Sequence, residues 1–234
     1  MELVARIAAE PDRAALLFDI DGTLAPIVER PEDARVPDET RDELRRLADT
    51  YALVACVSGR PGAVAREIVG VEGVVYVGEH GLELDPEAAT WAARLREFKD
   101  RTAWPDEGKP LSAAFHYRTH PDHEAAEAAL RVVAERALEE GFRTRWGRMV
   151  LEVLPPLESS KGTAVRWLLE RDGLSRAMFA GDDTTDLDAF RALDGLELAV
   201  RVAVVSIEGP SALGEAADVI VGGTTELLEL IRNL

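Results

Sequence analysis

The segment that begins with the apolar run Ala14–Phe18 constrains the fold of this chain more than any other. Asp19 and Asp21 follow the run directly, and Gly22 comes next. An unbroken apolar run of this length is typical of a strand buried on both faces, as in a parallel sheet covered by helices. Because Gly22 lets the chain turn, we expect Asp19 and Asp21 at the carboxyl end of this strand, where open α/β sheets bind ligands.

Two carboxylates this close together need positive charge nearby. A divalent metal would provide it, and so would a phosphate site with its own cationic partners. A plain turn is the alternative interpretation, since Asp and Gly are common turn residues. An EF-hand is excluded, because a loop numbered from Asp19 has Leu24 where that site needs glycine.

The charge balance limits the class of partner. The chain has 234 residues and a formal net charge of −17, which argues against a general nucleic-acid or anionic-membrane binder. An anionic substrate would need a local cationic pocket. The length suits one domain of ordinary size carrying a second, smaller one.

Other features of the chain indicate its environment. Cys56 is the only cysteine, so an intramolecular disulfide is impossible. No apolar run reaches the length of a membrane span, and the segment 1–10 lacks the apolar core of a signal peptide. We therefore expect a soluble cytoplasmic protein that is a monomer or a weak homo-oligomer.

The order of predicted elements favours a parallel sheet. The first third of the chain alternates strand and helix, which implies right-handed crossovers. The same alternation returns after residue 156. The predicted strands are 14–18, 51–57, 74–77, 177–180, 196–205 and 218–221, and the predicted helices are 38–49, 63–69, 160–170, 187–193 and 225–234. Pro61 is expected in the first turn of the second of these helices, with Ser58 or Gly59 before it.

The middle of the chain follows another pattern. A helix at 87–100, a strand at 111–118, a helix at 121–140 and a hairpin from 142–148 and 149–154 indicate a separate small sheet with helices on one side. We therefore predict an α/β core of residues 1–83 and 157–234 and an inserted domain of residues 84–156.

Chemically interesting side chains follow the strands of the predicted core or open a core helix. They are Asp19 and Asp21, Ser58, Lys161, and the group Asp182, Asp183 and Asp186. Loops after parallel strands gather at one edge of the sheet, so these residues can meet. Taken singly, a helix cap explains Ser58 and the aspartate group, and Lys161 fits a solvated lysine. There is no Walker, dinucleotide or G-x-S-x-G motif.

Together these residues suit phosphoryl chemistry. Three or more carboxylates around one point indicate a hard cation, Mg²⁺ with retained waters. A lysine, a hydroxyl and a helix N-terminus can hold phosphate oxygens. One carboxylate can attack phosphorus to form an aspartyl-phosphate. A second carboxylate can protonate the leaving oxygen and later accept the proton of the attacking water.

The chain resembles the haloacid dehalogenase superfamily of phosphatases. The resemblance is carried by Asp-Ile-Asp-Gly-Thr-Leu at 19–24, Ser58, Lys161 and Gly-Asp-Asp-x-x-Asp at 181–186. Further motifs are similar to those of trehalose-6-phosphate phosphatases: Val-Ser-Gly-Arg at 57–60, Gly-Glu-His-Gly at 78–81, His-Tyr-Arg at 116–118, Leu-Glu-Val-x-Pro at 151–155, Lys-Gly at 161–162 and Gly-Asp-Asp-x-Thr-Asp-x-Asp-Ala-Phe at 181–190. The resemblance implies a Rossmannoid core with an inserted α/β cap and a role in trehalose biosynthesis.

The resemblance also implies roles for single residues. Asp19 would be the nucleophile, Asp21 the general acid/base, and Ser58 and Lys161 would bind the transferring phosphoryl group. The metal ligands would be Asp19, Asp21 through its carbonyl, Asp182 and Asp186. The implied contacts to substrate are Gly59, Arg60, Glu79, His80, Lys109, His116, Arg118, Arg148, Glu152 and Asp183.

Two departures from the family pattern leave alternatives open. The last motif has Leu187 where the family usually has Glu, and Leu154 replaces a basic residue often found there. The alternative substrates are another sugar phosphate and a glycosyl-glycerate phosphate. A catalytically idle sugar-phosphate sensor or a synthase partner is the alternative from another class, and for Arg118 and Glu152 the alternative is an ion pair across a sheet.

Overall fold

The computed structural model describes residues 2–28, 30–106, 108–147, 149–206 and 209–234. The chain divides into two compact units, one of Met1–Gly81 with Ser159–Leu234 and the other of Leu82–Glu158. The insertion expected at 84–156 lies within the second unit. Among the described residues, no helix is both long and apolar enough to cross a membrane.

The first unit is built on a parallel sheet. Its six strands are hydrogen-bonded in the order β3-β2-β1-β7-β8-β9, and every neighbouring pair is parallel. The strands are β1 (Ala14–Phe18), β2 (Leu53–Val57), β3 (Val75–Val77), β7 (Arg176–Gly181), β8 (Leu198–Val204) and β9 (Val219–Val221). All residues of β1, β2 and β7 are buried. The predicted α/β class with a parallel sheet is confirmed.

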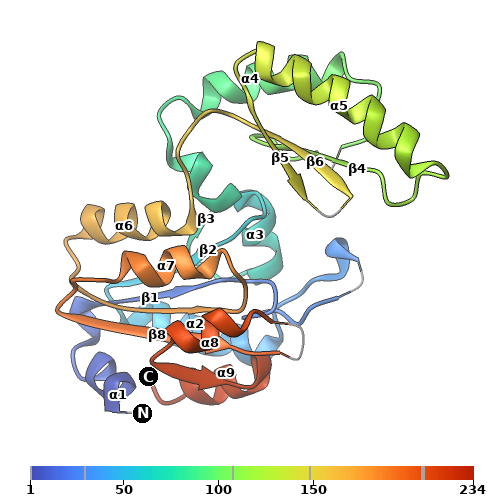
Figure 1. Ribbon diagram of the computed structural model, residues 1–234. Helices are drawn as coiled ribbons and strands as arrows, with labels where there is room; N and C mark the ends of the chain where they lie inside the picture. Colours follow the sequence, from blue (N-terminus) through green and yellow to red (C-terminus); the bar gives the residue numbers. More distant parts are fainter. Residues whose placement is uncertain (1, 29, 107, 148, 207–208) are drawn as a thin grey trace. The chain divides into compact units, whose positions relative to one another are not determined.

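Helices cover both faces of this sheet. The described helices of the first unit are α1 (Glu2–Ala8), α2 (Asp38–Thr50), α3 (Gly62–Val69), α6 (Lys161–Asp172), α7 (Asp186–Ala192), α8 (Ser211–Ala216) and α9 (Gly223–Ile231), with short 3₁₀ turns at Pro11–Arg13 and Pro31–Asp33. A third 3₁₀ segment, Glu79–Leu84, begins in the first unit and ends in the second. Helices α1, α2, α3 and α9 pack into one apolar cluster with Leu16 and Phe18. Helices α6 and α7 lie side by side in front of the sheet (Figure 1). The ring of Phe190 in α7 contacts that of Phe179 in β7 edge-on.

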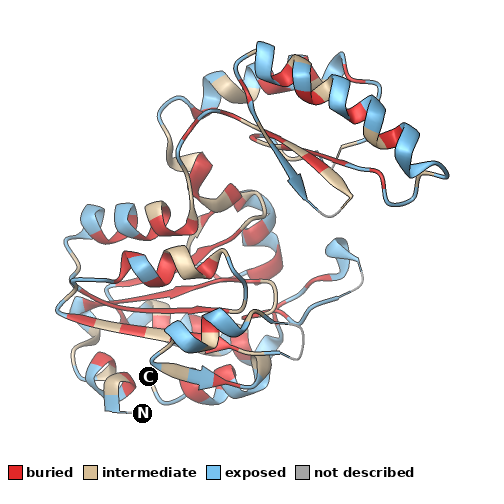
Figure 2. Ribbon diagram, viewed as in Figure 1, coloured by how far each residue is buried: buried red, intermediate tan, exposed pale blue. Residues whose placement is uncertain are grey.

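The second unit has a sheet with one helix-covered face. Its antiparallel strands lie in the order β4-β6-β5: β4 (Ala113–His116), β5 (Arg143–Gly147) and β6 (Val150–Leu154). Helices α4 (Ala88–Asp100) and α5 (His123–Glu139) pack on Phe115, Leu151 and Val153. In Figure 2 the side of α5 that faces the sheet is buried, whereas its outer side is exposed.

The structure corrects several local expectations. Helix α3 begins at Gly62 with Pro61 as its N-cap residue, so Ser58 and Gly59 do not cap it. Strand β4 ends at His116, which leaves Arg118 in the following turn. Helix α6 runs to Asp172, where Gly173 takes the left-handed conformation that ends many helices. Helix α8 was missed, because six residues carry too little periodic signal.

Candidate active site

Asp19 and Asp182 meet because β1 and β7 are neighbours in the sheet. Asp19 directly follows β1, and its backbone N–H donates to the carbonyl of Ala180 at 2.9 Å. Asp182 directly follows β7. Two carboxylates that are far apart in the chain therefore lie at the same carboxyl edge, as expected for a parallel sheet.

Gly22 allows this close approach. Its φ is +84°, and a Cβ placed on it would lie 2.0 Å from the Oδ2 of Asp182. The hydroxyl of Thr23 donates to Oδ1 of the same carboxylate at 3.3 Å. A side chain at position 22 would therefore push Asp182 away from the turn that follows Asp19.

Asp186 organises the loop after β7. It is fully buried at the start of α7, and its Oδ2 accepts hydrogen bonds from the backbone N–H groups of Asp182 and Asp183, each at 3.0 Å. Its Oδ1 accepts one from the Nζ of Lys161 at 2.7 Å. Asp186 thus fixes both the loop and the lysine.

Lys161 joins two of the carboxylates. Its Nζ lies 2.7 Å from Oδ1 of Asp19 and 2.7 Å from Oδ1 of Asp186, and only 3% of the residue is exposed. It is the first residue of α6, whose N-terminus is held by a capping box between Ser160 and Thr163. The cap fixes the direction in which the lysine leaves the helix.

Three carboxylates form a candidate metal site. Asp19, Asp182 and Asp186 each offer an oxygen, and these oxygens lie within 4.8 Å of one another. Oxygen donors with this much negative charge suit a hard divalent cation. The donor set therefore fits the metal that the sequence analysis anticipated.

Burial dominates the ionisation of this cluster. It raises the pKa of Asp19, Asp182 and Asp186 to about 6 in each case, with further raising by neighbouring carboxylates and opposition from Lys161. Burial alone would lower the pKa of Lys161, but the charges of Asp19 and Asp186 outweigh it, so its pKa is raised. The lysine is therefore cationic at neutral pH.

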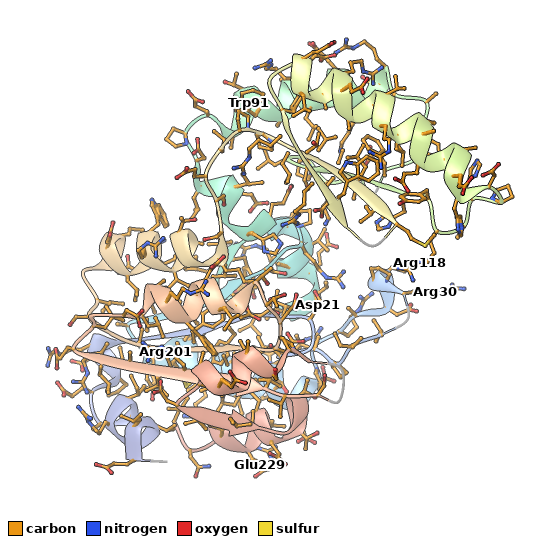
Figure 3. All side chains as sticks on the ribbon, in the orientation of Figure 1. Asp21, Arg30, Trp91, Arg118, Arg201 and Glu229 are labelled. Atoms are coloured by element: carbon orange, nitrogen blue, oxygen red, sulfur yellow. The ribbon has the colours of Figure 1, made fainter. Side chains whose placement is uncertain are left out.

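The side chain of Asp21 has different neighbours. Arg60 donates to both of its carboxylate oxygens, through Nε at 2.6 Å and Nη2 at 2.7 Å. The side chain of Asp21 therefore does not belong to the carboxylate cluster. Figure 3 labels Asp21 on the right-hand side of the core unit.

The loops after β2 and β3 bring Ser58 and His80 together. Ser58 is 1% exposed, and its Oγ accepts from the backbone N–H of Arg60 at 3.2 Å. A Cβ on Gly59 would lie 2.7 Å from the His80 ring, so glycine leaves room for the imidazole. The backbone φ angles of Glu79 and His80 are 46° and 55°, values that residues other than glycine rarely adopt.

The predicted substrate residues of the second unit are more dispersed. His116 and Glu152 share the sheet face opposite Phe115 and Leu151, as the register of β4 and β6 requires. Arg118 is exposed in the turn after β4. The carbonyl of Lys109 accepts from the Nζ of Lys99 at 2.5 Å.

Two further predicted substrate contacts lie elsewhere. Asp183 is exposed and accepts hydrogen bonds from the backbone N–H and the hydroxyl of Thr184, outside the carboxylate cluster. Arg148 lies outside the described residues.

Sequence reasoning missed Arg145 and the pairing of Arg60 with Asp21. Arg145 stands opposite Glu152 in the β5–β6 register and donates to it at 2.5 Å. This is the cross-strand ion pair left open for Glu152. The hairpin spacing could have suggested it, but no local signal links positions 21 and 60.

Comparisons with known proteins identify a family for this chain. The trehalose-phosphatase family model matches residues 17–107 and 106–217. A trehalose-phosphate phosphatase of Mycolicibacterium paratuberculosis is 35% identical over 205 residues, covering 77% of this chain and 51% of that protein. The chain spans between 16% and 63% of the length of curated relatives such as these.

Solved structures show the same fold. Trehalose-6-phosphate phosphatase of Aspergillus fumigatus matches with a TM-score of 0.65 at 23% identity, covering 99% of this chain and 96% of that one. A haloacid dehalogenase-like hydrolase from Bacteroides thetaiotaomicron matches with a TM-score of 0.60 at 16% identity, covering 94% and 98%. The predicted haloacid dehalogenase-like fold is confirmed, and the chain belongs to the trehalose-phosphatase family.

Proposed function

We propose that this chain is a Mg²⁺-dependent phosphatase that hydrolyses trehalose 6-phosphate to trehalose and phosphate in trehalose biosynthesis. The observation that carries the proposal is the position of Lys161 between Asp19 and Asp186, beside a third carboxylate, at the carboxyl edge of the sheet. We place the enzyme in the cytoplasm, with the first unit as catalytic core and the second as substrate-specificity cap.

Asp19 is the nucleophile in this proposal. Lys161 favours its ionised form and holds one of its oxygens, so the other oxygen can attack phosphorus. The bond from Asp19 to phosphorus forms as the bond from phosphorus to the sugar oxygen breaks. A Mg²⁺ ion held by Asp19, Asp182 and Asp186, and by the carbonyl of Asp21, would offset the charge of the phosphoryl oxygens.

Asp21 and Ser58 complete the chemistry. Asp21 gives a proton to the leaving sugar oxygen, and in the second half-reaction it accepts a proton from the water that attacks the aspartyl-phosphate. Ser58 donates a hydrogen bond to a phosphoryl oxygen. Asp21 is therefore restored to its starting form once per turnover.

The remaining contacts select the substrate. We assign Gly59, Glu79, His80 and Asp183 to the approach of the phosphorylated sugar in the first unit. Lys109, His116, Arg118, Arg148 and Glu152 are assigned to sugar recognition in the second. His116 and Glu152 support this, because both lie on the sheet face that α4 and α5 leave uncovered.

Phosphate release tests the proposal. Purified protein with Mg²⁺ is given trehalose 6-phosphate, sucrose 6-phosphate, glucose 6-phosphate and mannosyl-3-phosphoglycerate, and Asp19→Asn serves as the inactive control. We expect a strong preference for trehalose 6-phosphate and an acid-labile phosphoenzyme that the variant lacks. Preference for another sugar would retain the chemistry and change the substrate. Tight binding without release would favour a sensor.

A further inference from the structure

Arg60 holds both carboxylate oxygens of Asp21. Its Nε lies 2.6 Å from Oδ2 and its Nη2 lies 2.7 Å from Oδ1, a two-point contact that fixes the plane of the carboxylate. Its remaining nitrogen, Nη1, donates to the carbonyl of Pro31 at 2.9 Å. Each of the three guanidinium nitrogens is thus engaged with an oxygen of this unit.

The backbone around Asp21 is ordered without the help of Arg60. The N–H of Gly22 donates to the carbonyl of Ala25 at 2.8 Å, and the N–H groups of Leu24 and Ala25 donate to the carbonyl of Ile20. The side chain of Asp21, however, is 32% exposed, and the contacts described for its carboxylate both come from Arg60. The arginine therefore selects among the rotamers that the turn allows.

The backbone of Arg60 is held by the loops that follow β2 and β3. Its N–H donates to the Oγ of Ser58 at 3.2 Å, and its carbonyl accepts from the N–H of Glu79 at 2.9 Å. The side chain of Arg60 is only 19% exposed. Arg60 thus connects the rigid loop after β2 to the more exposed carboxylate after β1.

We propose that Arg60 is a positioning residue that aims the carboxyl group of Asp21 at the bridging oxygen of the phosphate ester. This inference rests on the proposed function. In the first half-reaction Asp21 starts as a neutral carboxyl group, with its proton on the lone pair of one oxygen that faces away from Arg60. The bond between Asp19 and phosphorus forms, the bond between phosphorus and the sugar oxygen breaks, and Asp21 passes this proton to the sugar oxygen. In the second, water attacks phosphorus, the bond to Asp19 breaks, and Asp21 recovers a proton from the water.

A positioning role has a distinctive kinetic signature. An alkyl leaving group such as a sugar hydroxyl needs a proton as it departs, whereas nitrophenolate leaves without one. The value of kcat/KM reports the steps up to the first irreversible one, here the transfer of phosphoryl to Asp19. Loss of Arg60 should therefore lower kcat/KM for a sugar phosphate far more than for p-nitrophenyl phosphate.

The experiment compares these two esters in matched variants. Arg60→Ala removes the contact, and Arg60→Lys keeps the charge but loses the two-point geometry. Asp21→Asn shows the pattern expected for loss of the acid itself. Arg35→Ala is the control, since Arg35 donates to the carbonyls of Glu32 and Ala34 in the same loop region without a described contact to Asp21.

We expect Arg60→Ala to lower kcat/KM for trehalose 6-phosphate by roughly 10- to 100-fold and for p-nitrophenyl phosphate by less than about 3-fold. Arg60→Lys should fall between Arg60→Ala and the wild type. Arg35→Ala should stay within about twofold of the wild type on both esters.

Three other outcomes would overturn the inference. Equal losses on both esters, with weaker inhibition by inorganic phosphate, would mean that Arg60 binds the phosphate itself. Equal losses with a lowered melting temperature would mean a purely structural role. A wild-type protein that is inactive on both esters would remove the proposed function, and with it this inference, so the two failures are distinguishable.

Discussion

The ammonium group of Lys161 lies 2.7 Å from Oδ1 of Asp19, although the two residues are far apart along the chain. Lys161 comes from the first turn of α6 and Asp19 from the end of β1. The contact provides positive charge beside a carboxylate that burial would otherwise keep protonated to higher pH.

Removal of the Lys161 side chain should therefore strongly reduce turnover. We expect Lys161→Ala to lower kcat by about 10²- to 10³-fold, as for the loss of one preorganised electrostatic contact. Arg171→Ala is the matched control, because the described contacts of this exposed residue on the same helix are local ones, with Asp172 and with the ring of Trp167. Phosphate release measures turnover, and circular dichroism checks the fold. Near-wild-type turnover in Lys161→Ala would rule out its proposed role.

The carboxylate cluster predicts a metal site that can be tested without an activity assay. Asp182→Asn removes one of the three clustered donors, whereas Asp183→Asn alters the exposed neighbour outside the cluster. We expect Mg²⁺ to raise the melting temperature of the wild type and of Asp183→Asn, because a ligand that binds the folded state stabilises it. Asp182→Asn should lose most of that increase. An equal increase in all three proteins would place the metal elsewhere.

The raised pKa values predict how stability depends on pH. In the metal-free folded state these aspartates hold their protons up to about pH 6, whereas their ordinary pKa is 3.8. Between these values the folded state binds more protons than the unfolded chain, so their contribution to the free energy of unfolding falls as pH rises. It is fully present below pH 3.8 and lost above about pH 6.

Bound Mg²⁺ should remove this loss, because it requires the ionised carboxylates. We therefore expect the Mg²⁺-induced stabilisation to grow between pH 5 and pH 7.5, as protons cease to compete with the metal. Thermal unfolding with and without Mg²⁺ across this range measures it. A stabilisation that is constant with pH would contradict the assignment of these aspartates as ligands.

A side chain at position 162 should disturb the packing of α6 on α7. A Cβ at this position would lie 2.4 Å from the backbone carbonyl oxygen of Asp188, so α6 could not keep its distance from α7. We expect Gly162→Ala to destabilise the protein by about 1–3 kcal/mol, as for other overpacked sites, and to reduce activity by shifting Lys161.

The control for this substitution is Gly214→Ala in α8. Among the described residues, a Cβ there would meet only the side chain of Ile220, at 3.8 Å, which is an ordinary contact. This change should be neutral or stabilise the protein by up to about 1 kcal/mol. Chemical denaturation measures both variants, and equal stability of the two would show that α6 and α7 can separate without cost.

Much of the fold is readable from local patterns. The apolar runs at β1, β2 and β7 predicted buried strands, and their alternation with helices predicted the parallel sheet, because such patterns depend on neighbours within a few residues. The membership of Asp19, Lys161, Asp182 and Asp186 in one site also followed, since parallel strands present their carboxyl ends together. Helix α8 escaped, because a helix this short is stabilised by packing rather than by its own pattern.

Local sequence is enough to identify the residues at the carboxyl ends of the strands, through apolar runs that end in aspartate and glycine. The pairing of the site residues, by contrast, is set by the tertiary structure. It placed Lys161 on Asp19 and Asp186, gave the side chain of Asp21 to Arg60, and set Arg145 against Glu152. These choices depend on strand order, register and the space left by glycines, and such distances are not encoded in any local stretch of chain.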